Sequence, residues 1–179
     1  MQLKSMAIPG VLYYLLAVVP MTFAAQGIGT CDLPRDLQQE IAAKNPGARI
    51  VAFPDLADDD KRLFKKDHGN DCPGLVKVDF YGDNKPTLAL VLIVNAGAKE
   101  TAELVVAHKI GQKWETVLLD NAGSSMPVVW SQSPGEYEEF NSEKKIRTTR
   151  PVIVFCGYNS WEVLYAWTGK SIDKIWLRD

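Results

Sequence analysis

The sequence predicts an α+β protein in which N-terminal helices pack on a largely antiparallel β-sheet of about seven or eight strands. Three observations lead to this prediction. Apolar residues recur with helical spacing before residue 69, and from residue 74 onward they alternate at every second position between turn residues. No long linker interrupts the chain, which favours one α+β domain over residues 28–179.

The first residues have the organisation of an export signal. A single charge, Lys4, precedes an apolar run from Ala7 to Val19, and a patch of small residues follows. The run is shorter than the roughly 20 apolar residues that a membrane-spanning helix needs, although an uncleaved anchor stays an alternative. We therefore expect a cleavable signal peptide over residues 1–24, with a cut as late as residue 27. The product would be periplasmic or secreted, and would meet a membrane only during export.

Two helices are expected ahead of the sheet. The first begins near Pro34, forms an apolar face with Leu37 and Ile41, and ends at residues 45–47, where Asn-Pro-Gly stops it. The second covers residues 55–68, with acidic residues in its first turn and basic residues in its last turn. These charges match the helix dipole at both ends.

The strands are expected to be short, except for one continuous apolar segment. Residues 88–94 are apolar at every position, which is typical of a central strand covered on both faces. The region 121–149 is polar and predicts at most one or two irregular strands. The other expected strands are residues 49–53, 76–80, 103–110, 113–119, 151–158, 161–168 and 172–178, with tight turns at 111–112 and 169–170.

The charge balance bears on the kind of partner. The chain has 20 basic and 22 acidic residues, a net charge of −2, and loses one more positive charge if Lys4 is cleaved off. A nearly balanced surface argues against nucleic acid or an anionic membrane as the main partner.

Three cysteines indicate one disulfide and one free thiol in an oxidising compartment. Cys156 alternates with Val152 in an apolar strand, which indicates a buried thiol. Cys31 and Cys72 both lie in polar segments beside expected elements, so we expect the disulfide between them. The segment 28–31 also faintly resembles a lipobox. If Cys31 carried a lipid, Cys72 and Cys156 would be left to pair with each other.

Asp79 and Asp83 lie in a glycine-containing turn that an apolar strand follows. Residues 79–91 thereby resemble the calcium-bearing hairpin of FG-GAP or VCBS-type repeats of exported proteins, in which oxygen ligands recur at alternate positions. Asp79 and Asp83 match the first and third ligand positions, whereas Tyr81 and Thr87 replace acidic or amide ligands. Calcium prefers six to eight oxygen ligands. We therefore expect a β-turn without a metal, with Asp79 and Asp83 as the candidate ligands.

The sequence contains no coherent catalytic or cofactor-binding motif. Its two histidines, His68 and His108, suit a helix end and a strand face. An envelope hydrolase or metal-dependent enzyme that uses His68, His108 and Cys72 is the alternative. A deep pocket joining His108 to a carboxylate would favour this alternative, and histidines placed apart would count against it.

The C-terminal hairpin is the candidate partner surface. With the turn at residues 169–170, the expected register pairs Tyr165 with Lys174 and Trp161 with Arg178, and aligns them on one face with Trp176. Aromatic residues and arginine are favoured in protein-binding surfaces, and Trp161, Tyr165, Trp176 and Arg178 are the candidate residues. We therefore expect a non-catalytic binding domain without cofactor, for instance an inhibitor or immunity-type protein acting on an envelope protein. A structural envelope component is the third hypothesis.

Overall fold

The computed structural model describes residues 31–179 apart from residue 98. The predicted signal peptide over residues 1–24, and the alternative cut at residue 27, lie outside the described residues.

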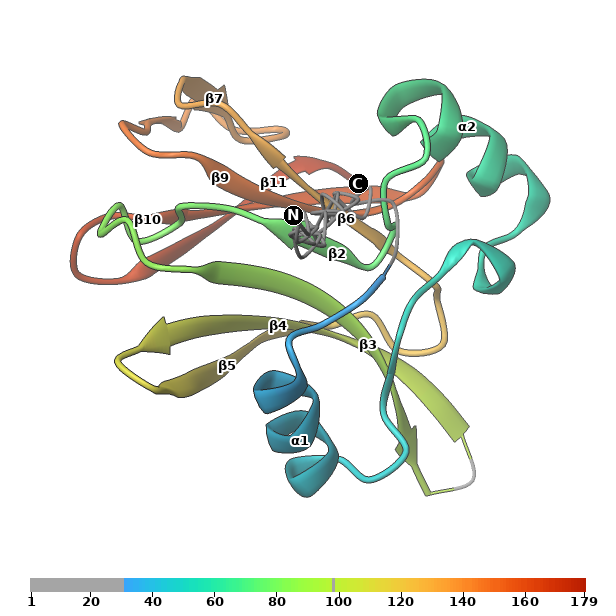
Figure 1. Cartoon of the computed structure of the whole chain (residues 1–179). Coiled ribbons are helices and arrows are strands. Elements are labelled where there is room, and N and C mark those ends of the chain that lie inside the picture. Colours follow the sequence, from blue (N-terminus) through green and yellow to red (C-terminus); the bar gives the residue numbers. More distant parts are fainter. Residues whose placement is uncertain (1–30, 98) are drawn as a thin grey trace, which may run out of the picture.

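The fold consists of two stacked antiparallel sheets, and the outer face of each sheet is covered by a helix or a hairpin (Figure 1). Sheet A contains β1 (Arg49–Ile50), β2 (Leu75–Lys77), β3 (Thr87–Ala96), β4 (Lys99–Ile110) and β5 (Lys113–Asn121). Sheet B contains β6 (Val128–Gln132), β9 (Val152–Gly157), β10 (Trp161–Trp167) and β11 (Ile172–Arg178). A separate hairpin is formed by β7 (Glu136–Glu138) and β8 (Lys145–Arg147). The α+β class and the antiparallel pairing are confirmed, but the expectation of one sheet of seven or eight strands is wrong.

The two helices also do not share one surface. Helix α1 (Arg35–Lys44) lies on the outer face of sheet A, where Leu37 and Ile41 are buried. Helix α2 (Asp58–His68) follows a short 3-10 turn, η1 (Phe53–Asp55), and lies near the end of β6 in sheet B, with Phe64 in the core between the sheets. The prediction of helices packed together on a single sheet is therefore incorrect.

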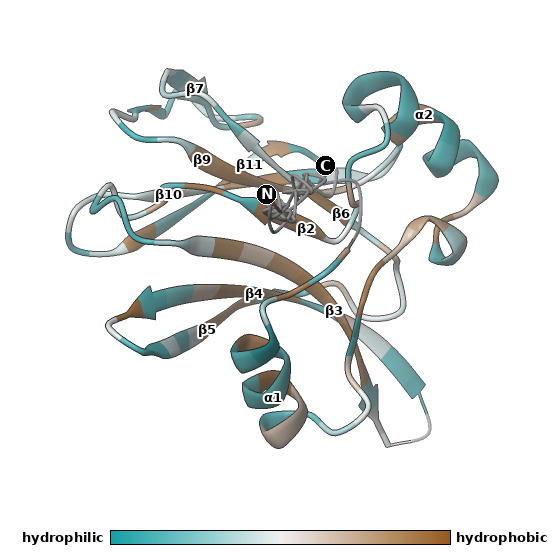
Figure 2. Cartoon of the chain, in the orientation of Figure 1, coloured by the Kyte–Doolittle hydropathy of each residue, from teal (hydrophilic) through white to brown (hydrophobic). Residues whose placement is uncertain are grey.

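Strand β3 is covered on both faces, as its continuous apolar sequence predicts. Ala89 and Val91 face the core between the sheets, whereas Leu90 and Leu92 belong to the apolar cluster beneath α1. Figure 2 shows hydrophobic residues concentrated on β3 and β9, while α2 and β7 are mostly hydrophilic. Sheet B is covered in the same way, because Tyr137 and Ile146 of the β7–β8 hairpin pack on its outer face.

The two edges of the sandwich differ. On one side the sheets are joined, since the backbone N–H of Val129 at β6 donates to the carbonyl oxygen of Pro73 beside β2 at 2.8 Å. On the other side, β5 ends sheet A and β11 ends sheet B. Backbone groups on the outer side of β5 have no strand partner among the described residues. This side is therefore the open edge of the molecule.

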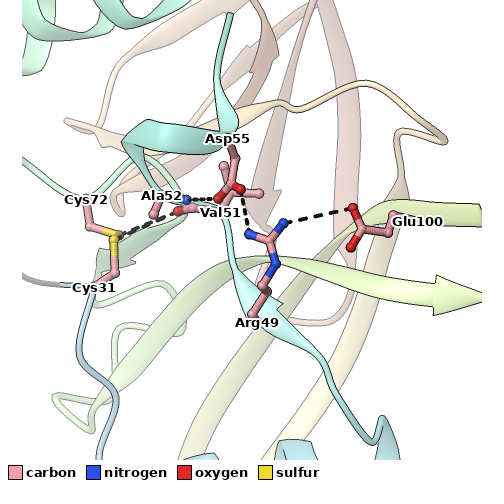
Figure 3. Close-up of polar contacts among 7 residues, drawn as sticks. All are labelled: Cys31, Arg49, Val51, Ala52, Asp55, Cys72 and Glu100. Carbon is pink, nitrogen blue, oxygen red and sulfur yellow. Dashed lines mark hydrogen bonds and ion pairs between the residues drawn. A yellow bond between two sulfur atoms is a disulfide. The ribbon is translucent and has the colours of Figure 1, made fainter.

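A disulfide between Cys31 and Cys72 ties the start of the described chain to the segment before β2, as expected from the sequence (Figure 3). Both sulfur atoms lie 3.9 Å from the carbonyl oxygen of Val51. Because the bond uses the sulfur of Cys31, that atom is not available to carry a lipid. Cys156 is free and buried, which confirms the predicted core thiol.

Next to the disulfide, one arginine connects the η1 turn to β4. Arg49 lies 2.6 Å from the carboxylate of Asp55 and 3.9 Å from that of Glu100 (Figure 3). Asp55 also accepts a hydrogen bond from the backbone N–H of Ala52 at 2.8 Å. These contacts hold the chain that leads into α2 against the edge of sheet A.

Candidate functional site

The aromatic residues of the C-terminal hairpin mostly point into the molecule. Tyr165 is buried in the core between the sheets, and Trp161 packs edge-on against Phe155 with ring centroids 4.9 Å apart. Trp176 on β11 is different, with 40% of its surface exposed. Only part of the predicted partner surface is therefore accessible to another protein.

Arg178 does not share a face with the other hairpin candidates. The expected pairs of β10 and β11 are present up to Val163 and Trp176, but the register then shifts, and Glu162 pairs with Arg178. The expected pairing of Trp161 with Arg178 is wrong. Because side chains alternate across a strand, a shift of one residue carries Arg178 to the opposite face.

One polar cluster links the two sheets at the open edge. Asp120 of β5 accepts hydrogen bonds from the hydroxyl of Tyr165 and from the ammonium group of Lys174, the latter at 2.6 Å. Burial opposes ionisation of Asp120, but these two donors hold the pKa of its carboxyl below the usual value. Burial and the same carboxylate raise the pKa of Tyr165. The Lys174 ammonium also lies 5.0 Å from the ring centre of Trp176.

The open edge carries an apolar rim that we define by four residues. Val117 and Leu118 lie in the middle of β5 and are 43% and 57% exposed. Trp176 of β11 and Phe140, which is 41% exposed, lie beside each other, since the Phe140 N–H donates to the Trp176 carbonyl at 2.7 Å. Lys174 joins the two pairs, because it contacts both Asp120 of β5 and the Trp176 ring.

One feature of the sequence indicates this rim, although the strand prediction did not take it into account. The run Val117-Leu118-Leu119 interrupts the alternation of β5, so apolar side chains occur on both faces of one strand. In a central strand both faces would be covered. In the edge strand β5 they are left exposed.

His108 lies in an enclosed network and not in an open pocket. One ring nitrogen is 2.9 Å from the Thr87 hydroxyl, and the other is 3.1 Å from the carboxylate of Asp83. The Tyr81 ring covers His108 with centroids 4.5 Å apart. Thr87 and His108 are both buried, so neither ring nitrogen is free to contact a substrate.

The candidate calcium ligands have other partners. Asp83 contacts His108 and, at 3.1 Å, the ammonium group of Lys85, while Asp79 accepts a hydrogen bond from the backbone N–H of Asn84 at 3.3 Å. Within the part of the chain that the structure describes, no group of three or more His, Cys, Asp or Glu side chains is arranged to hold a metal. The resemblance to FG-GAP or VCBS-type hairpins stays a prediction.

The residues of the alternative enzyme site are not brought together. Cys72 is in the disulfide. His68 is at the end of α2 with its ring centre 4.8 Å from that of Trp130, whereas His108 is on β4 beside Asp83. The three side chains have separate sets of neighbours.

No known protein family, curated protein or solved structure matches this chain. Among the described residues, no helix is both long enough and apolar enough to cross a bilayer.

Proposed function

We propose that the chain is an exported, non-catalytic domain that binds another protein at its open edge. The main support for this proposal is the unpaired edge of β5, in the middle of which Val117 and Leu118 are exposed. The occupant is an extended segment of a partner protein, which adds a strand to sheet A. An inhibitor or immunity-type role on an envelope protein is one form of this function.

The backbone of β5 supports an extended occupant. A sheet edge presents alternating N–H and C=O groups, and another strand is the partner that satisfies them in a regular row. Natural edge strands are commonly protected by charge, proline or a bulge. Residues 116–118 contain no charge and no proline, and the register shift of the β4–β5 pairing lies beyond them, between Leu104 and Val105 on the facing strand.

The side chains beside the edge support a protein partner in particular. Trp176 and Phe140 add aromatic surface, and the Asp120–Lys174 ion pair connects β5 to β11 beside them. An apolar centre with a polar neighbourhood is typical of protein interfaces, in which a few aromatic and aliphatic anchors contribute most of the affinity.

Two other hypotheses have less support. An enzyme using His68, His108 and Cys72 requires residues that lie apart, one of them in a disulfide. A purely structural component predicts no exposed apolar surface, whereas Val117 and Leu118, on the two opposite faces of β5, are both exposed.

The test compares capture of the partner by matched variants. Tagged mature protein with Leu118→Lys should retain its stoichiometric envelope partner at least about tenfold more weakly than the wild type, because charge at an edge opposes strand addition. Ala43→Lys, on the exposed side of α1, is the control and should bind like the wild type. A photoreactive residue at position 118 should cross-link to one extended segment of the partner. Absence of any stoichiometric partner, or equal capture by both lysine variants, contradicts the proposal.

Export is tested separately by the N-terminus of the native protein. Purified from its source, the chain should begin near residue 25 or 28 and be recovered outside the cytosol. A native chain that begins at Met1 and is recovered from the cytosol contradicts this part of the proposal without affecting the edge.

A further inference from the structure

A hollow lies on sheet B, between the end of α2 and the turn that joins β9 to β10. Its volume is about 270 Å³. It shares no residue with the apolar rim of the open edge. The polar and aromatic side chains that line it include Asp67, His68, Trp130, Tyr158, Glu162 and Arg178, and Cys156 also borders it.

Arg178, Glu162 and Asp67 line this hollow, and none of the three forms an ion pair within the described chain. Glu162 and Arg178 are directly paired across β10 and β11, yet their charged groups are not within 4.0 Å of each other or of another charged group in the described chain. A guanidinium nitrogen of Arg178 lies 4.0 Å from the sulfur of Cys156. A thiol is a weak acceptor, so the guanidinium keeps most of its hydrogen-bonding capacity.

The aromatic wall of the hollow is continuous. Trp130 lies between His68, with ring centres 4.8 Å apart, and Tyr158, whose ring is nearly parallel at 6.5 Å. Burial lowers the pKa of His68, so its imidazole is neutral at neutral pH and adds no charge to this wall. The Tyr158 hydroxyl is buried and has no hydrogen-bond partner among the described residues.

Cys156, which borders the hollow, is a poor nucleophile. Burial raises the pKa of Cys156 to about 12, so the side chain is a neutral thiol at neutral pH and not a nucleophilic thiolate. The hollow therefore offers one guanidinium group (Arg178), two carboxylates (Glu162 and Asp67) and an aromatic surface for reversible binding.

We propose that this hollow binds a free α-amino acid with an apolar or aromatic side chain. Arg178 takes the carboxylate, Glu162 takes the ammonium group, and the side chain lies against Trp130. Arginine suits carboxylates because its planar fork can donate two parallel hydrogen bonds. Small-ligand sites typically combine an apolar wall with a few polar groups that fix orientation. Because Glu162 and Arg178 are cross-strand partners, their side chains leave the sheet next to each other on one face, so one small ligand can reach both.

The test is a titration of the mature protein, followed by NMR, with each of the proteinogenic amino acids up to about 10 mM. L-phenylalanine is the reference ligand. N-acetyl-L-phenylalanine lacks the ammonium group and L-phenylalanine methyl ester lacks the carboxylate. Each should bind at least about tenfold more weakly than the free amino acid.

Variants assign the two roles. Glu162→Gln should weaken binding of the free amino acid but leave binding of the N-acetyl compound unchanged. Arg178→Gln should also weaken binding of the free amino acid, but it should leave binding of the methyl ester unchanged. Arg62→Gln, an exposed arginine on α2 that pairs with Asp59, is the control and should bind like the wild type. Circular dichroism verifies that each variant is folded, and the two glutamine variants serve as independent tests if one of them is not.

Two results overturn the proposal. One is the absence of binding by any amino acid at the highest concentration. The other is binding that neither glutamine variant weakens, which would place the ligand elsewhere. Neither result bears on the β5 edge, because the hollow and the rim have no residue in common.

Discussion

Removal of the Cys31–Cys72 bond tests how far the chain around the two helices depends on this cross-link. The two cysteines are 41 residues apart in the sequence, and α1, β1 and α2 lie between them. In the chain-entropy treatment, a loop of this length lowers the entropy of the unfolded chain enough to stabilise the fold by about 4 kcal/mol at 25 °C. The double variant C31A/C72A should therefore lose about 4 kcal/mol of unfolding free energy.

The folded state itself should change little in this variant. Leu37 and Ile41 stay buried under sheet A, and Phe64 stays in the core, because none of these contacts depends on the sulfur atoms. Since small domains have total stabilities of about 5 to 15 kcal/mol, the variant should still fold at 25 °C, with a much smaller margin.

The assay is urea unfolding of the mature protein, followed by circular dichroism and tryptophan fluorescence. Oxidised wild type, reduced wild type and the double variant are compared, and the reduced wild type should match the variant. Mass spectrometry of the unreduced protein verifies that the bond is present. A bond that is present but stabilises by less than about 1 kcal/mol would refute the entropy argument.

Three further predictions concern the core and the open edge. Phe155→Ala removes a fully buried ring between the sheets and should lower the unfolding free energy by about 3 to 5 kcal/mol in chemical denaturation. Burial opposes ionisation of Asp120, but Lys174 and Tyr165 lower the pKa of its carboxyl in the folded state. The ionised carboxylate therefore stabilises the fold at pH values above the ordinary carboxyl pKa. This contribution is lost as the pH falls through the lowered value. The stability difference between wild type and Asp120→Asn should therefore shrink as the pH falls from about 5 to about 2, and a constant difference would contradict this assignment. Cys156 should not react with a thiol reagent at pH 8 in the native protein, because its pKa is raised by burial to about 12, and should react as a single thiol after unfolding without reduction.

The local sequence pattern predicted secondary structure correctly where each residue's environment depends on its near neighbours in the chain. The helix over Arg35–Lys44 and the strand pairs joined by two-residue turns follow from periodicity and turn residues. The disulfide was also predictable, because two of three cysteines lie in polar segments and Cys156 lies in an apolar strand. The strand β8, in the polar region 121–149, was missed, since three residues with alternating exposure give almost no periodic signal.

The candidate site was predictable only in part. An aromatic hairpin was visible in the sequence, and Trp176 is indeed exposed. The burial of Tyr165 and the turn of Arg178 to the opposite face were not visible. The burial of Tyr165 depends on which sheet covers β10. The orientation of Arg178 depends on a register shift that no local sequence pattern indicates.

By itself the sequence determined the two helices and most of the strand segments, the antiparallel class and the cysteine pair, because these depend on period, turn chemistry and local polarity. Only the tertiary structure decided that the strands divide into two stacked sheets, and that β5 is an edge while β3 is central. Both segments contain consecutive apolar residues, so their sequences look alike. Their exposure differs because long-range hydrogen bonds and packing, which join residues far apart in the chain, decide which strand is covered and which is left open to a partner.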